Sequence, residues 1–443
     1  MKKILTIFMI AVMFLTLNGC GSNDSNTQND VADVETSEST RDDGITVESG
    51  SSSEDLNTKD YDVSETESAS EEAAGDISVA MSTSESKSTS EIVSDFIENR
   101  TNSQYEAGLL TAGEWNDNEN YEYFMEILND NSWYNMQSHW NFVNWTRYEF
   151  MVINEKDQPL IGAKIELHDA QNTYYTSYTD NTGYAVIYPF LDKTFIQEPQ
   201  LDARISFNQN TYEIVTLDDS YFKITLDEKA SPVENVDIML VVDTTGSMED
   251  ELEYIKTELS DVVNRVNKEN ANNLDIRVSA NYYRDHGDEY LVRSFPFTNN
   301  LKQVTNEMSQ QFANGGGDYE EAVVEALNDA IYNHNWNENA EAKLLFLVLD
   351  APPHHTDQNI SQIHQLIKEA NELGIRIVPI VSSGVDKDTE FLLRFLDIST
   401  NGTYIFLTDH SGVGNSHLTP TIGYYQVEQL NDLMVKVINS YIK

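Results

Sequence analysis

The feature that most constrains the fold is the apolar run at residues 236–242, which leads directly into the polar segment Asp243-Thr-Thr-Gly-Ser247. A continuous run of this kind is typical of a strand in a parallel sheet that helices cover on both faces. Residues 252–266 then place apolar side chains at helical spacing. Strand, polar loop and helix in this order predict the start of an alternating βαβ fold.

The rest of the C-terminal half repeats this alternation. Further buried strands are expected at 344–349 and 375–381, and helices at 360–373 and 427–441. Gly374 is expected to end the first of these helices, because glycine readily adopts the left-handed conformation of a helix C-cap. Residues 235–443 are therefore predicted to form an α/β domain with a doubly wound, mainly parallel, Rossmann-like sheet. Such a sheet binds ligands at the carboxyl ends of its strands.

Three polar loops are expected at that edge of the sheet, namely residues 243–247, 315–318 and 350–354. Their side chains supply carboxylate and hydroxyl oxygens. Hard oxygen ligands of this type suit Mg²⁺, Mn²⁺ or Ca²⁺. The three loops together predict a site for one divalent cation.

The first loop resembles the metal-ion-dependent adhesion site of von Willebrand factor type A domains. In that family an Asp-x-Ser/Thr-x-Ser loop, a residue that follows a glycine pair and a third-loop aspartate surround one dication. Asp243, Thr245 and Ser247 match the first loop, and Asp350 matches the third. The resemblance covers residues 235–443. It implies a bound Mg²⁺, or Mn²⁺ or Ca²⁺, that a carboxylate from a protein ligand completes.

The second loop departs from the common pattern. Asp318 stands where many members have threonine, whereas hemicentin-like members have Gly-Gly-Gly-Asp with Pro-Glu two residues on. This chain keeps the glycines and Asp318, but Glu320 replaces the proline. The resemblance therefore implies Asp318 as a fifth metal-site residue, and the departure leaves open whether it touches the metal directly.

Other interpretations of these loops are weaker. Gly315-Gly-Gly317 is not followed by the Gly-Lys-Ser/Thr of a phosphate loop. His354 and His355 are expected at the rim of the metal site rather than as zinc ligands or as a general base. Arg284 and Asp285 are expected to form a supporting ion pair, and the alternative is that Asp285 selects ligands. No Ser-His-Asp arrangement has the context of a nucleophile elbow, so we do not expect an enzyme.

Two smaller regions precede this domain. Residues 148–230 alternate with a period of two and contain Pro159-Leu-Ile-Gly-Ala163 and Thr179-Asp-Asn-Thr-Gly183. They resemble Ig-like and carboxypeptidase-regulatory-like β-sandwiches, which implies a spacer or binding module. Residues 101–147 are rich in tryptophan and tyrosine, with helices expected at 122–128 and 133–142 and a loop at 110–115. Their aromatic side chains are expected to be core that packs on a neighbouring domain rather than a sugar-binding surface.

The N-terminus carries a targeting pattern. Lys2 and Lys3 precede an apolar run at 4–17, which is shorter than the roughly 20 residues that span a bilayer. The run ends in Leu17-Asn-Gly-Cys20, which resembles a bacterial lipobox and contains the only cysteine of the chain. The resemblance implies that residues 1–19 are a lipoprotein signal peptide and that Cys20 carries the lipid. The alternative is an ordinary signal peptide with an incidental cysteine.

Residues 20–100 are predicted to be a disordered tether. Residues 21–100 hold 21 acidic and four basic residues and are rich in serine and threonine, so they cannot bury enough apolar surface to offset chain entropy. The whole chain carries a formal net charge of −48. A surface this acidic repels phosphate, so nucleic acid is not an expected partner.

These features together predict a lipoprotein that is extracytoplasmic and held on the cell membrane by its lipid, at the outer membrane if the cell has one. It would bind a protein ligand through a cation-dependent adhesion site. A structural envelope scaffold with a degenerate metal site is the alternative. A metal-dependent hydrolase is a third possibility, since the same cation could polarise a phosphate or a carbonyl.

Overall fold

The computed structural model describes residues 45–49, 106–195, 198–214, 217–270 and 274–443. The predicted signal peptide, Cys20 and most of the predicted tether lie outside these residues. No helix in the described part of the chain is long and apolar enough to cross a membrane.

An eight-stranded mixed sheet forms the centre of the C-terminal domain, with strand order β12-β11-β10-β13-β14-β15-β2-β16. Its strands are β2 (Thr111–Trp115), β10 (Asn235–Asp243), β11 (Asp275–Tyr283), β12 (Val292–Arg293), β13 (Ala342–Leu349), β14 (Ile375–Val381), β15 (Tyr404–Leu407) and β16 (Glu428–Gln429). The five adjacent strands β11-β10-β13-β14-β15 are mutually parallel, as predicted. The remaining strands, β12 at one edge and β2 and β16 at the other, are antiparallel to their neighbours.

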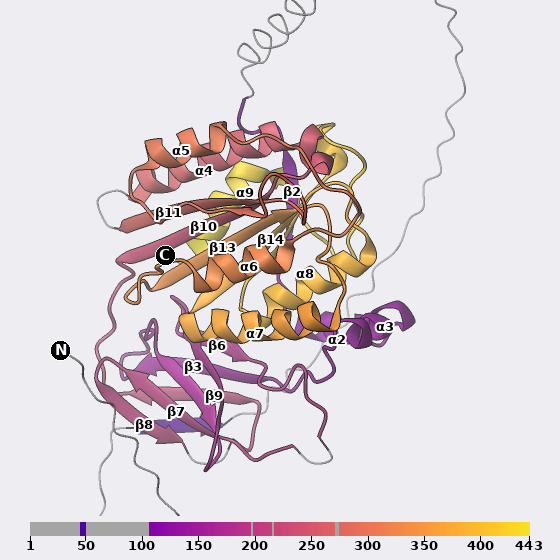
Figure 1. Ribbon diagram of the computed structural model, residues 1–443. Helices are drawn as coiled ribbons and strands as arrows, with labels where there is room; N and C mark the ends of the chain where they lie inside the picture. Colours follow the sequence, from indigo (N-terminus) through magenta and orange to yellow (C-terminus); the bar gives the residue numbers. More distant parts are fainter. Residues whose placement is uncertain (1–44, 50–105, 196–197, 215–216, 271–273) are drawn as a thin grey trace, which may run out of the picture. The chain divides into compact units, whose positions relative to one another are not determined.

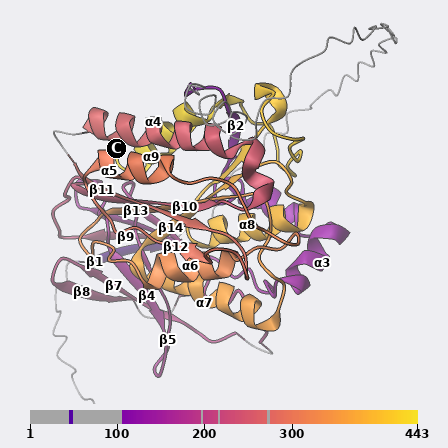
Figure 2. The ribbon, with the colours of Figure 1, turned by 45° about the horizontal axis from the view of Figure 1, so that its top comes forward.

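Helices cover both faces of this sheet (Figures 1 and 2). One face carries α4 (Leu252–Asn270), α5 (Leu301–Ser309) and α9 (Leu430–Ser440), and the other carries α6 (Val323–Tyr332), α7 (Asp357–Leu373) and α8 (Lys387–Ser399). Each face encloses its own hydrophobic core. Gly374 ends α7 with φ of 73°, as expected for a left-handed C-cap. The predicted doubly wound α/β fold is confirmed.

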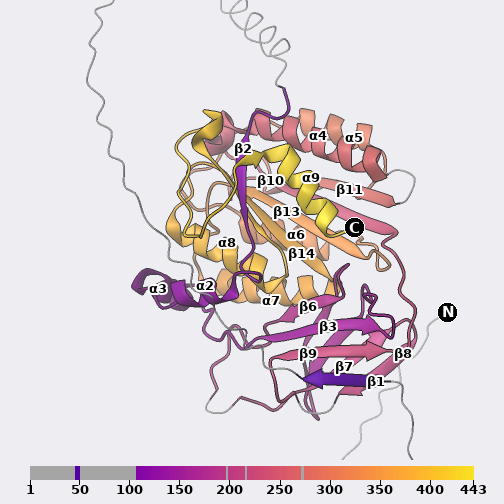
Figure 3. The same ribbon diagram turned by 180° about the vertical axis from the view of Figure 1, so that it is seen from behind.

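Strand β2 corrects the prediction for residues 110–115, which were expected to be a loop. It pairs antiparallel with β15 and β16 and lies beside α9 (Figure 3). Leu110 and Ala112 are fully buried, and Gly113 lies so close to Phe406 that a Cβ would be only 2.4 Å from its ring. The pairing partner comes far later in the sequence, so no local pattern could show it. A strand that precedes the sandwich thus completes the sheet of the C-terminal domain.

Two short helices follow β2, close to where the sequence predicts them: α2 (Tyr121–Ile127) and α3 (Asn131–His139). Phe124, Trp133 and Phe142 are buried and pack against the phenylalanines of α8. Trp133 lies with its ring centroid 4.7 Å from that of Phe391. The aromatic residues of this segment are therefore core of the C-terminal domain, as expected.

A buried ion pair joins the same segment to α8. Both side chains of Arg394 and Asp117 are inaccessible to solvent, and the guanidinium donates to the two carboxylate oxygens at 2.8 and 2.6 Å. Asp117 also accepts a hydrogen bond from the indole of Trp115. Arg394 donates further to the carbonyl of Thr421 and, at 3.4 Å, to Glu390. The charge of Arg394 is thus balanced entirely by buried partners.

Strand β1 and seven strands between β2 and β10 form a β-sandwich of two four-stranded sheets, with orders β1-β9-β3-β6 and β5-β4-β7-β8. Its strands are β1 (Ile45–Ser49), β3 (Tyr148–Asn154), β4 (Lys164–His168), β5 (Thr173–Tyr178), β6 (Tyr184–Ile187), β7 (Asp202–Phe207), β8 (Asn210–Ile214) and β9 (Tyr221–Leu226). Gly183 has φ of 79°, as the predicted turn requires, and its α-carbon lies against the backbone of Val152. The predicted all-β region is confirmed.

Strand β1 departs from the prediction for residues 20–100. It pairs antiparallel with β9 at the edge of one sandwich sheet. Edge pairing is made by backbone groups and does not require an apolar composition, so a composition argument for a disordered tether could not detect it. The predicted tether is therefore wrong at residues 45–49.

Candidate metal centre

The first predicted loop follows β10 and is closed by its own side chains. Asp243 is fully buried, and its Oδ1 accepts hydrogen bonds from the backbone N–H and the hydroxyl of Thr245, both at 2.8 Å. The hydroxyls of Thr245 and Ser247 are 3.1 Å apart. Ser247 is exposed, so this loop opens to solvent there. The second carboxylate oxygen of Asp243 has no hydrogen-bond partner.

The third predicted loop begins with Asp350, directly after β13. Its side chain is buried, and Oδ1 has no hydrogen-bond partner. Burial and the nearby charge of Asp350 raise the pKa of Asp243 to about 7. Burial also raises the pKa of Asp350 to about 6, against the opposing effect of a hydrogen bond with Ser247. The structure thus brings the predicted residues of the first and third loops together.

Glycines of the second loop let it lie against the first. The N–H of Gly246 donates to the carbonyl of Gly315 at 3.1 Å. Gly316 has φ of 73°, and a Cβ there would lie 2.8 Å from a carboxylate oxygen of Glu321 and 3.4 Å from Thr245. Only glycine allows the second loop this conformation and this close approach.

Glu321, at the end of the second loop, lies next to the first and third loops. This residue was not identified from the sequence. Glu321 is 3% exposed, and its Oε2 has no hydrogen-bond partner. Its N–H donates to the carbonyl of Pro352, which ties the second loop to the third. Burial, followed by the charges of Asp243, Asp285 and Asp350, raises the pKa of Glu321 to about 9. The available signal was the Pro-Glu of the hemicentin-like pattern, whose glutamate position is Glu321.

Asp318, the predicted second-loop ligand, lies elsewhere. It is exposed, and its carboxylate is grouped with Asp285 and His354, whose possible ligand atoms all lie within 4.8 Å of one another. His354 Nε2 is 2.7 Å from Asp285 Oδ1. The expected ion pair between Arg284 and Asp285 is therefore replaced by a histidine–aspartate pair. Arg284 turns inward, where it donates to the backbone carbonyls of Thr244 and Phe312.

Buried oxygen atoms without hydrogen-bond partners indicate whether this centre fits a cation. Asp243 Oδ2, Asp350 Oδ1 and Glu321 Oε2 are buried without partners, and the buried side chain of Tyr283 lies beside them. Burial and the charges of these carboxylates raise the pKa of Tyr283 above its ordinary value. Buried carboxylates without partners are costly, and a hard dication is the species that would satisfy three of them. The residues present therefore fit a divalent metal.

Residues 237–413 match the family described as "von Willebrand factor A domain". The match supports a von Willebrand factor A (vWA) domain in this segment, which is called the vWA domain from here on. Two structures of proximal thread matrix protein 1 (PTMP1) from the mussel byssus are similar to this chain, with 15% and 14% sequence identity and TM-scores of 0.28 and 0.29. The alignments cover 37% and 38% of this chain and 40% and 43% of those chains, so this chain spans less than half their length. The comparison with curated proteins gives no match.

Cation binding by the vWA domain should strengthen as pH rises. Asp243, Asp350 and Glu321 have pKa values raised to about 7, 6 and 9, so each must lose a proton that it holds at lower pH before it can ligate a metal. We expect Mn²⁺ affinity to rise between about pH 6 and pH 9, with proton release on binding. Calorimetry of Mn²⁺ binding in buffers of different ionisation enthalpy measures both quantities. An affinity that is constant over this range would contradict the expectation.

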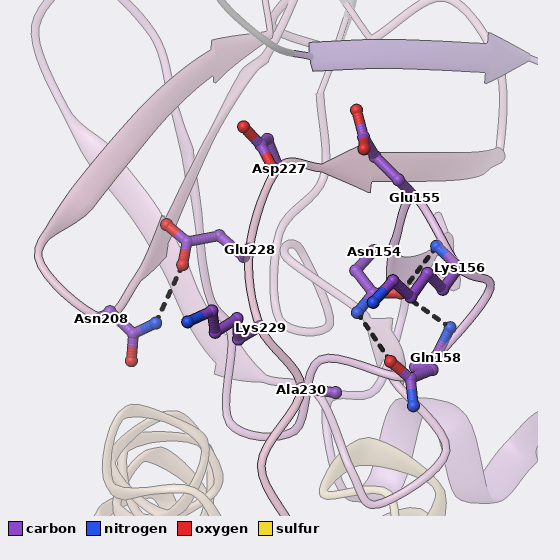
Figure 4. Close-up of a pocket in the computed structure, with 9 residues that line it drawn as sticks. All are labelled: Asn154, Glu155, Lys156, Gln158, Asn208, Asp227, Glu228, Lys229 and Ala230. Carbon is purple, nitrogen blue, oxygen red and sulfur yellow. Dashed lines mark hydrogen bonds between the residues drawn. The ribbon is translucent and has the colours of Figure 1, made fainter.

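A separate cavity of about 590 Å³ lies in the β-sandwich and contains none of the predicted site residues (Figure 4). Several of its polar side chains bond to one another, as Asn208 does to Glu228 and Asn154 to Gln158. Lys156 and Lys229 line it together with three carboxylates, so its charges are mixed. Because its polar groups are largely satisfied internally, this cavity is a weaker candidate than the metal centre.

Proposed function

We propose that this protein binds a partner protein through a divalent cation held by its vWA domain. Domains of this family commonly act in protein binding and adhesion, which supports the proposal. The observation that carries it is the group of buried, unpartnered carboxylate oxygens on Asp243, Asp350 and Glu321. Mg²⁺ is the proposed ion, with Mn²⁺ and Ca²⁺ as alternatives of the same ligand preference.

The proposed ligand set assigns a separate task to each residue type. The carboxylates of Asp243, Asp350 and Glu321 would hold the ion, directly or through water. The neutral hydroxyls of Thr245 and Ser247 would contribute oxygen atoms without adding charge. When bound, the ion would offer a coordination position to an oxygen of the partner at the solvent-exposed side of the centre. This arrangement serves recognition rather than a reaction.

The test compares partner capture with and without the cation. Full-length protein immobilised on beads is exposed to native surface extract in Mn²⁺ and then washed with EDTA. We expect a partner that EDTA elutes and that Asp243→Ala fails to capture, with circular dichroism as the check that this variant is folded. A partner that remains bound equally well in excess EDTA would reject the proposal and favour a scaffold with a degenerate metal site.

We also propose that the chain is a lipoprotein displayed outside the cytoplasm, anchored in the membrane through lipid on Cys20. The support is the lipobox-like Leu17-Asn-Gly-Cys20 after a short apolar run. Labelling of growing cells with a fatty-acid analogue should mark the wild-type protein and leave Cys20→Ala unmarked. Equal labelling of the two proteins would rule the anchor out.

A further inference from the structure

We propose that the partner docks on the metal centre with a basic segment, rich in lysine or arginine, and completes the cation with a neutral oxygen. This inference rests on the proposed function and specifies the partner's chemistry. It replaces the carboxylate donor expected from the family resemblance, because Glu321 of the second loop adds a third buried carboxylate to the centre.

The loops around the centre are acidic without any compensating lysine or arginine. The first loop, residues 243–251, contains four acidic residues, the second, residues 314–321, contains three, and the third, residues 350–356, contains one. None of these three loops contains a lysine or an arginine. One dication offsets two of the eight carboxylates and His417 pairs with a third, Glu251, so the loaded centre remains negative.

The charge count at the ion itself points in the same direction. Three carboxylates, from Asp243, Asp350 and Glu321, already exceed the charge of one dication. A fourth carboxylate from a partner would be brought into a site of low dielectric against this excess, where repulsion is large. A hydroxyl, amide or carbonyl oxygen would complete the coordination without that cost.

Exposed or half-buried carboxylates lie on the first and second loops and on the loops that follow β11 and β14, at Glu249, Asp288, Asp318, Glu320 and Asp386. Asp288 accepts hydrogen bonds from the N–H groups of Gly316 and Asp285, which places it directly beside the second loop. The hydroxyl of Tyr319 accepts from the N–H of Asp386, so the loop that follows β14 joins the same rim. We call these five residues the acidic rim.

The positive groups nearest the rim are already engaged. Arg284 is almost completely buried and donates to two backbone carbonyls. The amine of Lys387 bonds to Glu390, Thr419 and Thr421. His354 is paired with Asp285. His354 also lies 3.7 Å from Glu320, but no lysine or arginine side chain is paired with a residue of the acidic rim in the described part of the chain, so the rim can interact with positive charge from outside the chain.

An aromatic ring lies within the rim. Tyr319 stands between Asp318 and Glu320 in the second loop and is 43% exposed. A lysine or arginine side chain can place its charge over such a ring while it pairs with the flanking carboxylates. The ring and the carboxylates thus suit the same kind of side chain. A field of one sign around a cleft also speeds association with an oppositely charged partner.

The experiment measures binding of two synthetic peptides to the full-length protein in Mn²⁺ by fluorescence anisotropy. The peptides have equal length and alternate serine with either lysine or glutamate. Glu249→Gln/Glu320→Gln removes two rim charges. Asp218→Asn/Asp219→Asn in the sandwich is the matched control with the same change in charge. Mn²⁺ binding is measured on every sample.

We expect the lysine peptide to bind the wild-type protein with an affinity that falls as salt is added. Its affinity for the rim variant should be at least about tenfold weaker, and its affinity for the sandwich variant should be unchanged. Tighter binding of the glutamate peptide, or an equal loss of lysine-peptide affinity in both variants, would overturn the inference. If Mn²⁺ still bound in those samples, the proposed function would stand. Lysine-peptide binding that EDTA does not alter would also overturn it, because attraction to any acidic surface would then suffice. Absence of Mn²⁺ binding would instead reject the proposed function itself.

Discussion

Replacing Glu321 by glutamine should weaken Mn²⁺ binding about 100-fold, which corresponds to roughly 2.7 kcal/mol. Glutamine keeps the length and shape of the side chain and one carbonyl oxygen, but it removes the negative charge. Glu321 is buried with an unpartnered oxygen and its N–H is bonded to the carbonyl of Pro352, so the folded protein already holds this carboxylate in place for a cation. Calorimetric titration of cation-free protein with Mn²⁺ provides the measurement.

Asp318→Asn is the matched control, because it removes the same charge from the same loop. Asp318 is exposed and grouped with Asp285 and His354, so we expect its loss to change Mn²⁺ affinity by less than about threefold through screened long-range attraction alone. A large loss for Asp318→Asn with a small one for Glu321→Gln would show that the family's Gly-Gly-Gly-Asp aspartate holds the metal, and our assignment of Glu321 would be wrong.

Replacing Asp117 by alanine should lower the free energy of unfolding by about 3 kcal/mol. The variant leaves the guanidinium of Arg394 fully buried after the loss of two hydrogen bonds from its main counter-charge. We place the effect at the lower end of the range for broken buried pairs because Glu390 remains 3.4 Å from the same guanidinium. Denaturation in urea, followed by tryptophan fluorescence, measures the change.

Asp432→Ala provides a comparison with an exposed ion pair. Asp432 lies 2.7 Å from Arg265, but both side chains are about a third or more exposed, so its removal should cost well under about 1 kcal/mol. A double variant, Asp117→Leu/Arg394→Met, removes both charges of this pair, while Glu390 keeps its ion pair with Lys387, and should be more stable than Asp117→Ala. If Asp117→Ala unfolded at the same urea concentration as the wild type, the pair would contribute nothing and our account of this contact would fail.

Much of the C-terminal fold was predictable because its signals are local. The apolar run at 375–381 became β14 with the same bounds, and Gly374 took the left-handed conformation that ends α7. The loop that contains Asp243, Thr245 and Ser247 could be placed because a buried strand and a helix, both evident in the sequence, fix the loop between them; their role as metal ligands stays a prediction. Asp350 was found for the same reason, since it directly follows the apolar strand β13.

The missed features depend on contacts between distant segments. Strand β2 is recognisable only through its partner β15, which lies almost at the other end of the chain. Asp318 and Glu321 are three residues apart in one loop, and the sequence could not tell which of them faces Asp243. The backbone turn at Gly316 and the hydrogen bond between Glu321 and Pro352 decide this, and both depend on the folded second and third loops.

The position of β2 has a consequence for how the sandwich is attached. The chain leaves the eight-stranded sheet after β2, builds the sandwich, and returns to the same sheet at β10. Seven of the eight sandwich strands are thus inserted between β2 and β10, whereas β1 comes from the chain before β2. A module joined to its host at both ends cannot swivel as freely as one on a single linker. A fragment that began at residue 235 would lack β2 and leave one side of β15 open, so an autonomous version of this domain has to begin before residue 111.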